Sequence, residues 1–298
     1  MAAAPPVEPA HLDEVRRRLL DWFAVAGRRL PWRATRDPYR VLVAEMLAQQ
    51  TQAGRAAAAW PRFLERFPDA EALAAASPAE VLRAWQGIGY NRRALALRAT
   101  AVAVVERGWP DTVEGLAALP GVGPYTARAV ACFALGLQVA PVDTNVARVL
   151  ARALTGTDPA ELRPAARQAL ADAALPEGRA WAWSSALMDA GALHCRPRPR
   201  CGGCPLAAAC RWRALGTAAP PARPRVQPPF AGSDRRWRGA VVRALAAAPD
   251  GLEPAALAAA VDAAAAPRPA GWFDGLLRRL EADGLLARAP GGRLRLPG

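Results

Sequence analysis

The sequence predicts an all-α protein with a small additional domain at its C-terminal end, and three observations lead to this prediction. Apolar residues recur at helical spacing through most of the chain. Glycine, proline and aspartate residues separate the periodic segments, and alternation typical of strands is almost absent. The 298 residues are enough for one large or two modest domains with a sizeable core.

The predicted helices follow one another along the chain. Residues 11–28 carry apolar residues at helical spacing and end at a glycine. From residue 38 to about residue 215, the pattern predicts helix after helix. The clearest examples are residues 77–89, 91–108 and 145–156.

The end of the chain has a different composition. Residues 214–231 are rich in Pro and Ala without periodicity, which is typical of a linker. Beyond them, the pattern predicts three short helices and then two short strands around a Pro-Gly-Gly turn. We therefore expect a small winged-helix-like domain over residues 232–298.

The charge balance indicates a polyanionic partner. The net charge is +13, and all 39 basic residues are arginine. Such an excess of base favours nucleic acid, and the planar guanidinium suits phosphate. No apolar run is long enough to span a bilayer, and the N-terminal residues lack the features of a signal peptide. We expect a cytoplasmic, nucleoid-associated protein that acts as a monomer and does not contact membranes.

The stretch LPGVGPYTARAV, residues 119–130, predicts a tight turn before a helix. Gly121 and Gly123 permit backbone conformations that other residues resist, and Pro124 suits the first position of a helix. Since the preceding segment is also helical, the pattern is helix–hairpin–helix, with backbone amides that can bind a DNA phosphate. An ordinary glycine turn between two helices explains the same residues.

Two carboxylates are candidates for chemistry. Asp143 precedes a predicted helix and follows an apolar stretch, so it can be a simple N-cap or an anion that stabilises a cation beside bound DNA. Glu45 lies in an apolar helix, and the positions three and four residues away from it carry no cation. Burial would raise the pKa of this carboxyl, as a general acid requires. A salt bridge with a distant arginine is the competing interpretation.

Four of the five cysteines lie close together, with a spacing that indicates a metal site rather than disulfides. Only one Cys-x-x-Cys pair occurs, whereas zinc sites usually combine two, which favours a [4Fe–4S] cluster over zinc. His194 adjoins the first cysteine and is expected to be a bystander, and Cys132 is expected to be a core residue. The predicted ligands are Cys195, Cys201, Cys204 and Cys210.

In combination, these features resemble the helix–hairpin–helix DNA glycosylases, specifically the MutY-type adenine glycosylases. The resemblance covers about residues 20–212. It rests on the cysteines and on LPWR (30–33), DPYRVLVAEMLAQQTQ (37–52), GIGYNRRA (87–94), LPGVGPYTA (119–127) and VDTNVARVLAR (142–152). It implies a glycosylase core over residues 11–213, with a six-helix module at about 30–136 and a cluster module formed by the N-terminal helix and residues 137–213.

The resemblance also implies roles for single residues. Glu45 matches the acid that protonates adenine at N7, and Asp143 matches the aspartate that stabilises the cationic sugar, with Tyr125 and Asn145 beside it. The remaining matches are residues of the base pocket and residues that contact the DNA. Trp32 and Arg33 are expected to line the pocket for the flipped base. The residues expected to contact the DNA are Gln50, Ile88, Tyr90, Gly121, Val122 and Gly123.

The expected reaction is hydrolysis of the N-glycosidic bond of adenine mispaired with 8-oxoguanine or guanine, after base flipping. Because the chain has no lysine to form a Schiff base, we expect a monofunctional enzyme without lyase activity. Two features depart from the family. The first cysteine gap is one residue short, and the residues after Cys210 do not resemble the large β-rich domain that reads 8-oxoguanine. A mismatch thymine or uracil glycosylase, or a non-catalytic iron–sulfur protein that binds DNA, are the alternatives.

Overall fold

The fold is known from a computed structural model that describes residues 6–216, 230, 233–263 and 268–298. The chain divides into two compact units. Unit 1 comprises Met1–Val41, Asp111–Ala117 and Gly123–Val226, and unit 2 comprises Leu42–Pro110, Ala118–Val122 and Gln227–Gly298. Most of the predicted linker, residues 214–231, lies outside the described residues.

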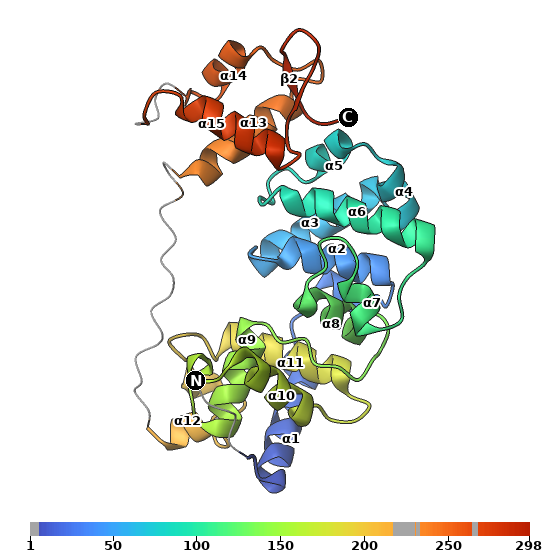
Figure 1. The fold of residues 1–298 in the computed structure, drawn as a ribbon. Helices are drawn as coiled ribbons and strands as arrows, with labels where there is room; N and C mark the ends of the chain where they lie inside the picture. Colours follow the sequence, from blue (N-terminus) through green and yellow to red (C-terminus); the bar gives the residue numbers. More distant parts are fainter. Residues whose placement is uncertain (1–5, 217–229, 231–232, 264–267) are drawn as a thin grey trace. The chain divides into compact units, whose positions relative to one another are not determined.

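The described residues are mostly helical and contain almost no strand, which confirms the predicted all-α class (Figure 1). The α-helices up to the cysteines are α1 Pro9–Ala26, α2 Pro38–Ala48, α3 Ala53–Arg66, α4 Ala70–Ala75, α5 Pro78–Ala84, α6 Arg92–Arg107, α7 Val113–Ala117, α8 Pro124–Phe133, α9 Thr144–Leu150, α10 Pro164–Ala174 and α11 Ala180–Leu193. After them come α12 Arg211–Ala214, α13 Asp234–Ala246, α14 Pro254–Ala260 and α15 Trp272–Ala282. Short helical turns occur at η1 Pro31–Ala34, η2 Ala151–Thr155, η3 Pro159–Glu161 and η4 Cys201–Gly203.

The core of unit 1 is formed by α1, α9, α10 and α11. Helix α11 packs against α9 and α1, and α10 packs against α9. Val15 and Leu19 of α1 are fully buried in this core beside Trp183 of α11. The apolar stripe of α1 is thus matched by apolar faces from the C-terminal part of unit 1, which explains why a helix from the start of the chain belongs there.

In unit 2, α4 and α5 pack against α6. Ser77 and Glu80 form a capping box that starts α5, because each side chain binds the backbone N–H of the other residue. Helix α5 ends at Ala84, earlier than the predicted segment 77–89. The reason is that Gly87 and Gly89 have φ values of 85° and 80°, which a helix cannot contain.

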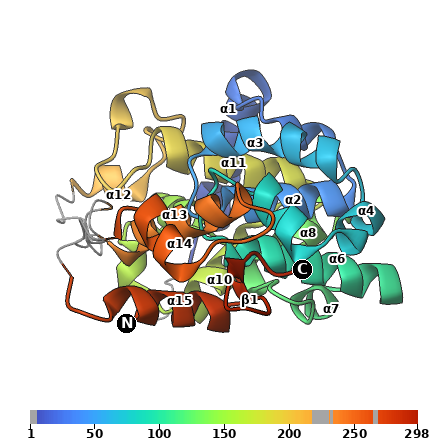
Figure 2. The ribbon, with the colours of Figure 1, turned by 90° about the horizontal axis from the view of Figure 1, so that it is seen from above.

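The C-terminal part of unit 2 contains three helices and a hairpin, as Figure 2 shows from above. Helix α13 packs against α14, α15 and the second strand. Strands β1 Ala287–Arg288 and β2 Leu294–Arg295 pair antiparallel, and Leu252 forms an additional bridge to Leu294. Helix α13 also packs on α5, where the Arg83 side chain donates to the Ala246 carbonyl at 3.3 Å.

The turn before α8 corrects one detail of the sequence analysis. Position 121 requires glycine for two reasons: its φ is 73°, and a Cβ there would lie 2.4 Å from the Cβ of Ala96. Gly123 has an extended backbone, φ −87°, and a Cβ there would meet nothing within 4 Å. The expectation that the turn needs both glycines is therefore wrong for Gly123. Pro124 begins α8, as predicted.

None of the helices in the described part of the chain is long and apolar enough to cross a membrane.

Candidate functional site

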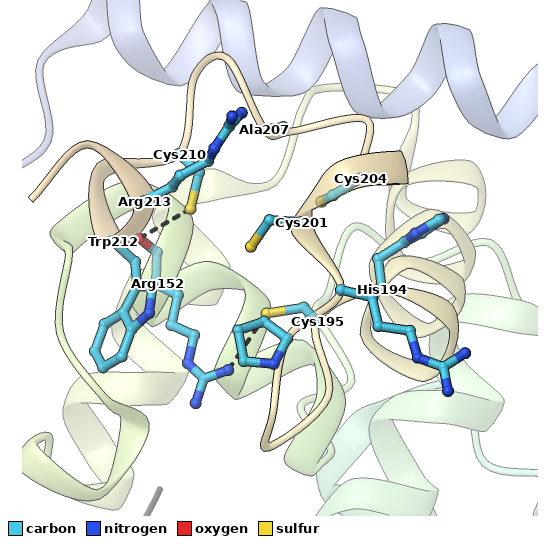
Figure 3. A pocket seen from close by; sticks show the side chains of 11 residues that line it. Arg152, His194, Cys195, Cys201, Cys204, Ala207, Cys210, Trp212 and Arg213 are labelled. Atoms are coloured by element: carbon cyan, nitrogen blue, oxygen red, sulfur yellow. Dashed lines mark hydrogen bonds between the residues drawn. The ribbon is translucent and has the colours of Figure 1, made fainter. Parts of the chain in front are cut away.

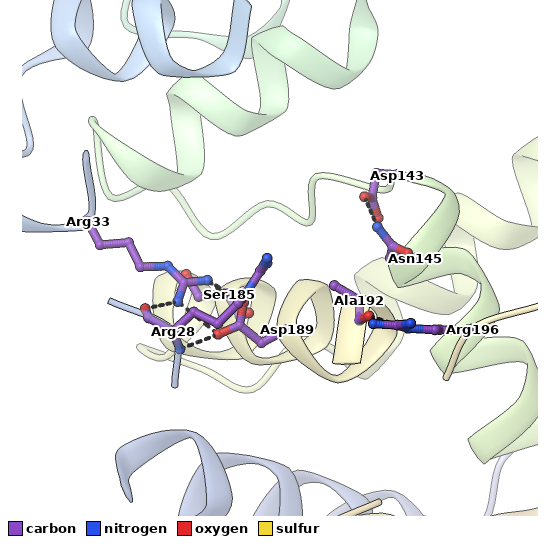
Figure 4. A network of polar contacts seen from close by, with 8 residues as sticks. All are labelled: Arg28, Arg33, Asp143, Asn145, Ser185, Asp189, Ala192 and Arg196. Atoms are coloured by element: carbon purple, nitrogen blue, oxygen red, sulfur yellow. Dashed lines mark hydrogen bonds and ion pairs between the residues drawn. The ribbon is translucent and has the colours of Figure 1, made fainter. Parts of the chain in front are cut away.

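The start of α9 holds Asp143 in a defined orientation. Its Oδ1 accepts a hydrogen bond from the Val146 N–H at 2.7 Å, which makes Asp143 the N-cap of the helix. Its Oδ2 accepts a second bond from the Asn145 side-chain amide at 2.9 Å (Figure 4). Asp143 is half-buried. The capping role predicted as the simple alternative is thus present, and a neutral amide additionally fixes the second oxygen.

Asn145 is itself positioned by two neighbours. Gly191 of α11 allows α9 to come close, since a Cβ there would lie 2.5 Å from the Cβ of Asn145. Arg148 donates from Nη2 to the Asn145 Oδ1 at 2.6 Å and from Nε to the backbone carbonyl of Cys195. Burial lowers the pKa of Arg148, while Cys195 raises it. Hydrogen bonds therefore connect the backbone at the first predicted cysteine ligand with the carboxylate of Asp143.

A second carboxylate of unit 1, Asp189 of α11, is fully buried and bound to two arginines (Figure 4). Arg28 donates to it from the backbone N–H at 2.8 Å and from Nε at 2.6 Å. Arg33 adds two bonds, from Nη1 at 2.8 Å and Nη2 at 2.9 Å. Burial alone would raise the pKa of Asp189, but the bonds from Arg33 and the Arg28 backbone hold that pKa below its usual value.

The two predicted pocket residues lie on the short turn η1. The Arg33 guanidinium is held by Asp189, by the carbonyls of Arg28 and Ser185 at 2.6 and 3.4 Å, and by the Phe23 ring 5.2 Å from its centre. Trp32 is half-buried. Most of the hydrogen-bonding capacity of Arg33 therefore serves to anchor η1 to α11.

All four clustered cysteines border one cavity of unit 1, together with His194, Arg152 and Trp212 (Figure 3). Burial raises the pKa of the Cys195 and Cys210 thiols, and it raises the pKa of Cys204 to about 11. Arg152 partly offsets the rise in the pKa of Cys195, because its Nη1 lies 3.9 Å from the Cys195 Sγ. Its guanidinium also lies over the Trp212 ring, 4.8 Å from the ring centre.

Four thiols are the donor type found in iron–sulfur clusters and in zinc sites. Within the described residues, however, no group of three or more His, Cys, Asp or Glu side chains is arranged so that it could hold a metal ion. The four thiols border the same cavity (Figure 3). His194 contacts Trp22 edge-to-face with ring centroids 5.7 Å apart, as a packing residue would.

In unit 2, Glu45 lies in the middle of α2 and is 9% exposed, so the predicted burial is confirmed. Its immediate neighbours in the helix, Ala44 and Met46, are both almost fully buried. The apolar character of α2 thus places a carboxyl group inside a packed helix.

Three of the residues predicted to contact the DNA, namely Gln50, Ile88 and Tyr90, lie on two surface turns of unit 2. Gln50, just after α2, is exposed, and Tyr90, just before α6, is 44% exposed. Both have a left-handed backbone, with φ values of 52° and 50°. Ile88 is only 7% exposed, so its side chain would have to move outward to reach DNA. Arg93 binds the backbone of both turns.

The hairpin turn presents backbone rather than side chains. Val122 is buried, and its N–H donates to the Leu119 carbonyl at 3.1 Å within the turn. The first hydrogen bond of α8 runs from the Ala127 N–H to the Gly123 carbonyl. Backbone N–H groups before Ala127 therefore have no partner within the helix and can bind an anion. Tyr125, in the first turn of α8, is half-buried.

Sequence reasoning missed the residues that position the candidate side chains within each unit. Asp189 carries a signal that could have been found, a single acid in the apolar helix segment ALMDAGAL. Arg93, Arg148 and Arg152 lie within the motifs GIGYNRRA (87–94) and VDTNVARVLAR (142–152), but the sequence does not show which groups they bind.

The all-α architecture, the helix–hairpin–helix turn and the four-cysteine cavity define the class of protein, and comparisons with known proteins agree. The family profile described as "HhH-GPD superfamily base excision DNA repair protein" matches residues 43–171. An adenine DNA glycosylase of Mycobacterium tuberculosis is 42% identical to this chain, over 97% of the chain and 95% of that relative. A human adenine DNA glycosylase is 37% identical over 68% of the chain and 40% of the human protein.

Among solved structures, a thermostable thymine-DNA glycosylase matches with a TM-score of 0.65 and 30% identity, over 69% of this chain and 98% of that one. The mycobacterial relative matches nearly to both ends of the chain, whereas the thymine-DNA glycosylase matches about two thirds of it. The chain belongs to the HhH-GPD superfamily of base excision DNA repair proteins.

Proposed function

We propose that this chain is a DNA glycosylase of base excision repair that hydrolyses the N-glycosidic bond of adenine. The observation that carries the proposal is the 42% identity over 97% of the chain with an adenine DNA glycosylase. The substrate is double-stranded DNA in which adenine is mispaired with 8-oxoguanine or guanine. The target nucleotide must leave the base stack, because the glycosidic bond is inaccessible within the duplex.

Asp143 stabilises positive charge on the sugar as the bond to the base breaks. Its support comes from the fixed orientation of the carboxylate, since the Val146 N–H and the Asn145 amide bind different oxygens. A preorganised charge needs no rearrangement when the cationic sugar forms, which is what makes electrostatic stabilisation effective. Asn145 acts as a positioning residue, and Tyr125 lies at the hairpin end of α8, beside the backbone amides.

Glu45 is the general acid that protonates the leaving adenine at N7. Its support is its position in the buried part of α2, at 9% exposure. General acid catalysis requires a carboxyl group that carries a proton. Protonation of the base and stabilisation of the sugar are separate tasks, and two carboxyl groups in different surroundings can divide them. Trp32 and Arg33 line the pocket of the extruded base.

DNA contacts come from backbone and side chains of three turns. Gln50 and Tyr90 enter the duplex near the extruded nucleotide, and Ile88 follows after moving outward. The turn formed by Gly121, Val122 and Gly123 binds a phosphate, for which the open space beside Gly123 leaves room. These contacts carry no base sequence preference, as repair at any position requires.

The four cysteines at one cavity would hold a [4Fe–4S] cluster. Such a cluster would cross-link the loop from Cys195 to Cys210 and offer a redox centre. Arg152 and Arg148 bind the backbone around Cys195 and bring positive charge to thiolate ligands. Purified protein should be brown and absorb near ~400 nm, whereas a colourless protein with one zinc per chain would contradict this assignment.

The chain has no lysine, so it cannot form a lysine Schiff base with the sugar, and we expect an abasic site as the product. Nicking of the DNA without alkali, at the same rate as base release, would contradict a monofunctional reaction.

A second candidate function is removal of thymine or uracil from mismatches, favoured by the 30% identity with a thymine-DNA glycosylase. Labelled duplexes carrying A:8-oxoG, A:G, T:G and U:G distinguish the two under single-turnover conditions. We expect release from the two adenine duplexes only. Release from T:G or U:G alone would establish the second candidate, and release from none would leave a non-catalytic DNA-binding protein.

A further inference from the structure

Arg93 lies where two surface turns of unit 2 meet. It belongs to the first turn of α6, and its guanidinium donates to three backbone carbonyls. Nη1 donates to Met46 and Gln49 at 2.6 and 2.5 Å, and Nη2 donates to Gly89 at 3.2 Å. The first two carbonyls close the C-terminal end of α2, and the third belongs to the loop before α6. One side chain thus binds both segments.

The residues that directly follow two of these carbonyls have unusual backbones. Gln50 follows Gln49 with φ 52°, and Tyr90 follows Gly89 with φ 50°. In the described part of the chain, Asp262 is the only other non-glycine residue with a positive φ. This conformation is unfavourable for any residue with a Cβ, and it persists where surrounding contacts hold it. At both turns, the hydrogen bond from Arg93 to the preceding carbonyl is such a contact.

The faces of the Arg93 guanidinium are also occupied. Its centre lies 5.1 Å from the Tyr90 ring centroid and 5.7 Å from that of Trp85. The Trp85 indole N–H donates to the Gly89 carbonyl at 3.0 Å, so the loop is held from two sides. Burial lowers the pKa of Arg93, and its Nε is buried without a hydrogen-bond partner. A buried arginine is costly, and carbonyls at a helix C-terminus, where the helix dipole is negative, offset part of that cost.

We infer that Arg93 is a positioning residue that holds the Gln50 and Tyr90 turns in one fixed arrangement for entry into duplex DNA. The inference rests on the proposed function, in which these turns enter the duplex at the extruded nucleotide. Without Arg93, both residues relax toward ordinary backbone conformations, so the two turns are no longer preformed when DNA arrives. Extrusion of a stacked, paired base then becomes slower, while bond cleavage on a base that has already left the stack does not.

The variant Arg93→Lys keeps the charge and removes the planar fork that reaches three carbonyls. The matched control is Arg98→Lys on the same helix. Arg98 also donates to a backbone carbonyl, from Nε to Ala76 at 2.5 Å, but this carbonyl follows α4 and belongs to neither turn. On a paired A:8-oxoG duplex in single turnover, we expect Arg93→Lys to be about tenfold slower than the unsubstituted chain. Arg98→Lys should match the unsubstituted chain.

The decisive comparison uses a duplex in which the adenine faces an abasic analogue and has no pairing partner. There, Arg93→Lys should recover to within about threefold of the unsubstituted chain on the same duplex, because no base pair has to be broken and extrusion costs less. Equal slowing on both duplexes, or no slowing on the paired one, would overturn the inference.

A measurement without DNA separates this inference from the proposed function. Amide hydrogen exchange at residues 49–51 and 89–91 should be about tenfold faster in Arg93→Lys than in Arg98→Lys. Unchanged exchange at these amides would refute the role of Arg93, whatever the DNA assays give. A chain that releases no base from any duplex would refute the proposed function, and the exchange result would still decide whether Arg93 holds the turns.

Discussion

Asp143 and Asp189 belong to the same unit, yet their surroundings differ in kind (Figure 4). Asp189 is fully buried and bound by the guanidinium groups of Arg28 and Arg33. Asp143 is half-buried, and its hydrogen bonds come from a backbone N–H and a side-chain amide, both neutral. The guanidinium groups of Arg28 and Arg33 compensate the charge of Asp189 directly. In the proposed function, Asp189 is the structural acid and Asp143 is the acid that acts in the chemistry.

The largest expected effect is that of Asp143→Asn on catalysis. Asparagine caps a helix about as well as aspartate, so the fold should survive while the charge is lost. We expect single-turnover excision of adenine to fall by about 10²–10³-fold. Asp69→Asn is the control, since Asp69 caps α4 by the same type of bond, from the Ala72 N–H at 2.8 Å. Equal losses in both variants would remove the distinction between capping and chemistry.

The next effect is that of Asp189→Asn on stability. The substitution leaves two arginines around a buried neutral amide, so the free energy of unfolding should fall by about 3–5 kcal/mol. Urea unfolding followed by circular dichroism measures it. If the free energy of unfolding falls by less than about 1 kcal/mol, the Asp189 ion pairs contribute no more to stability than ion pairs on the surface do.

Asn145→Ala should have a smaller effect on catalysis than Asp143→Asn, because the charge of Asp143 remains and only its orientation loosens. Loss of one hydrogen bond to a charged group predicts about a tenfold slower excision. The KM for duplex DNA should stay unchanged, since Asn145 is not expected to contact DNA. A rise in KM with unchanged kcat would instead place Asn145 in DNA binding.

The smallest effect is a dependence of stability on pH. The pKa of Asp189 is lowered in the folded state, so its contribution is fully present above the unfolded pKa of about 3.9 and is lost as pH falls through the folded value. The stability difference between the unsubstituted chain and Asp189→Asn should therefore shrink as pH decreases below about 4. A difference that stays constant down to pH ~2 would show that the lowered pKa does not contribute to stability.

Sequence patterns predicted what depends on neighbours along the chain. Helical periodicity gave the all-α class, and the start of α8 at Pro124 followed from local preference. The need for glycine at 121 but not at 123 was not predictable, since it depends on Ala96 of α6. The same holds for Arg93 and Arg148, because each binds a backbone carbonyl more than forty residues away, that of Met46 and that of Cys195. Long-range packing, which no local pattern records, decides these roles.

The most direct test of the account measures binding to two abasic mimics in the same duplex, one a cationic pyrrolidine nucleotide and one a neutral tetrahydrofuran nucleotide. If the free charge of Asp143 stabilises a cationic sugar, the unsubstituted chain should bind the cationic mimic at least about tenfold more tightly. Asp143→Asn should abolish that preference, while Asp69→Asn should retain it. A preference that survives in Asp143→Asn would contradict the account.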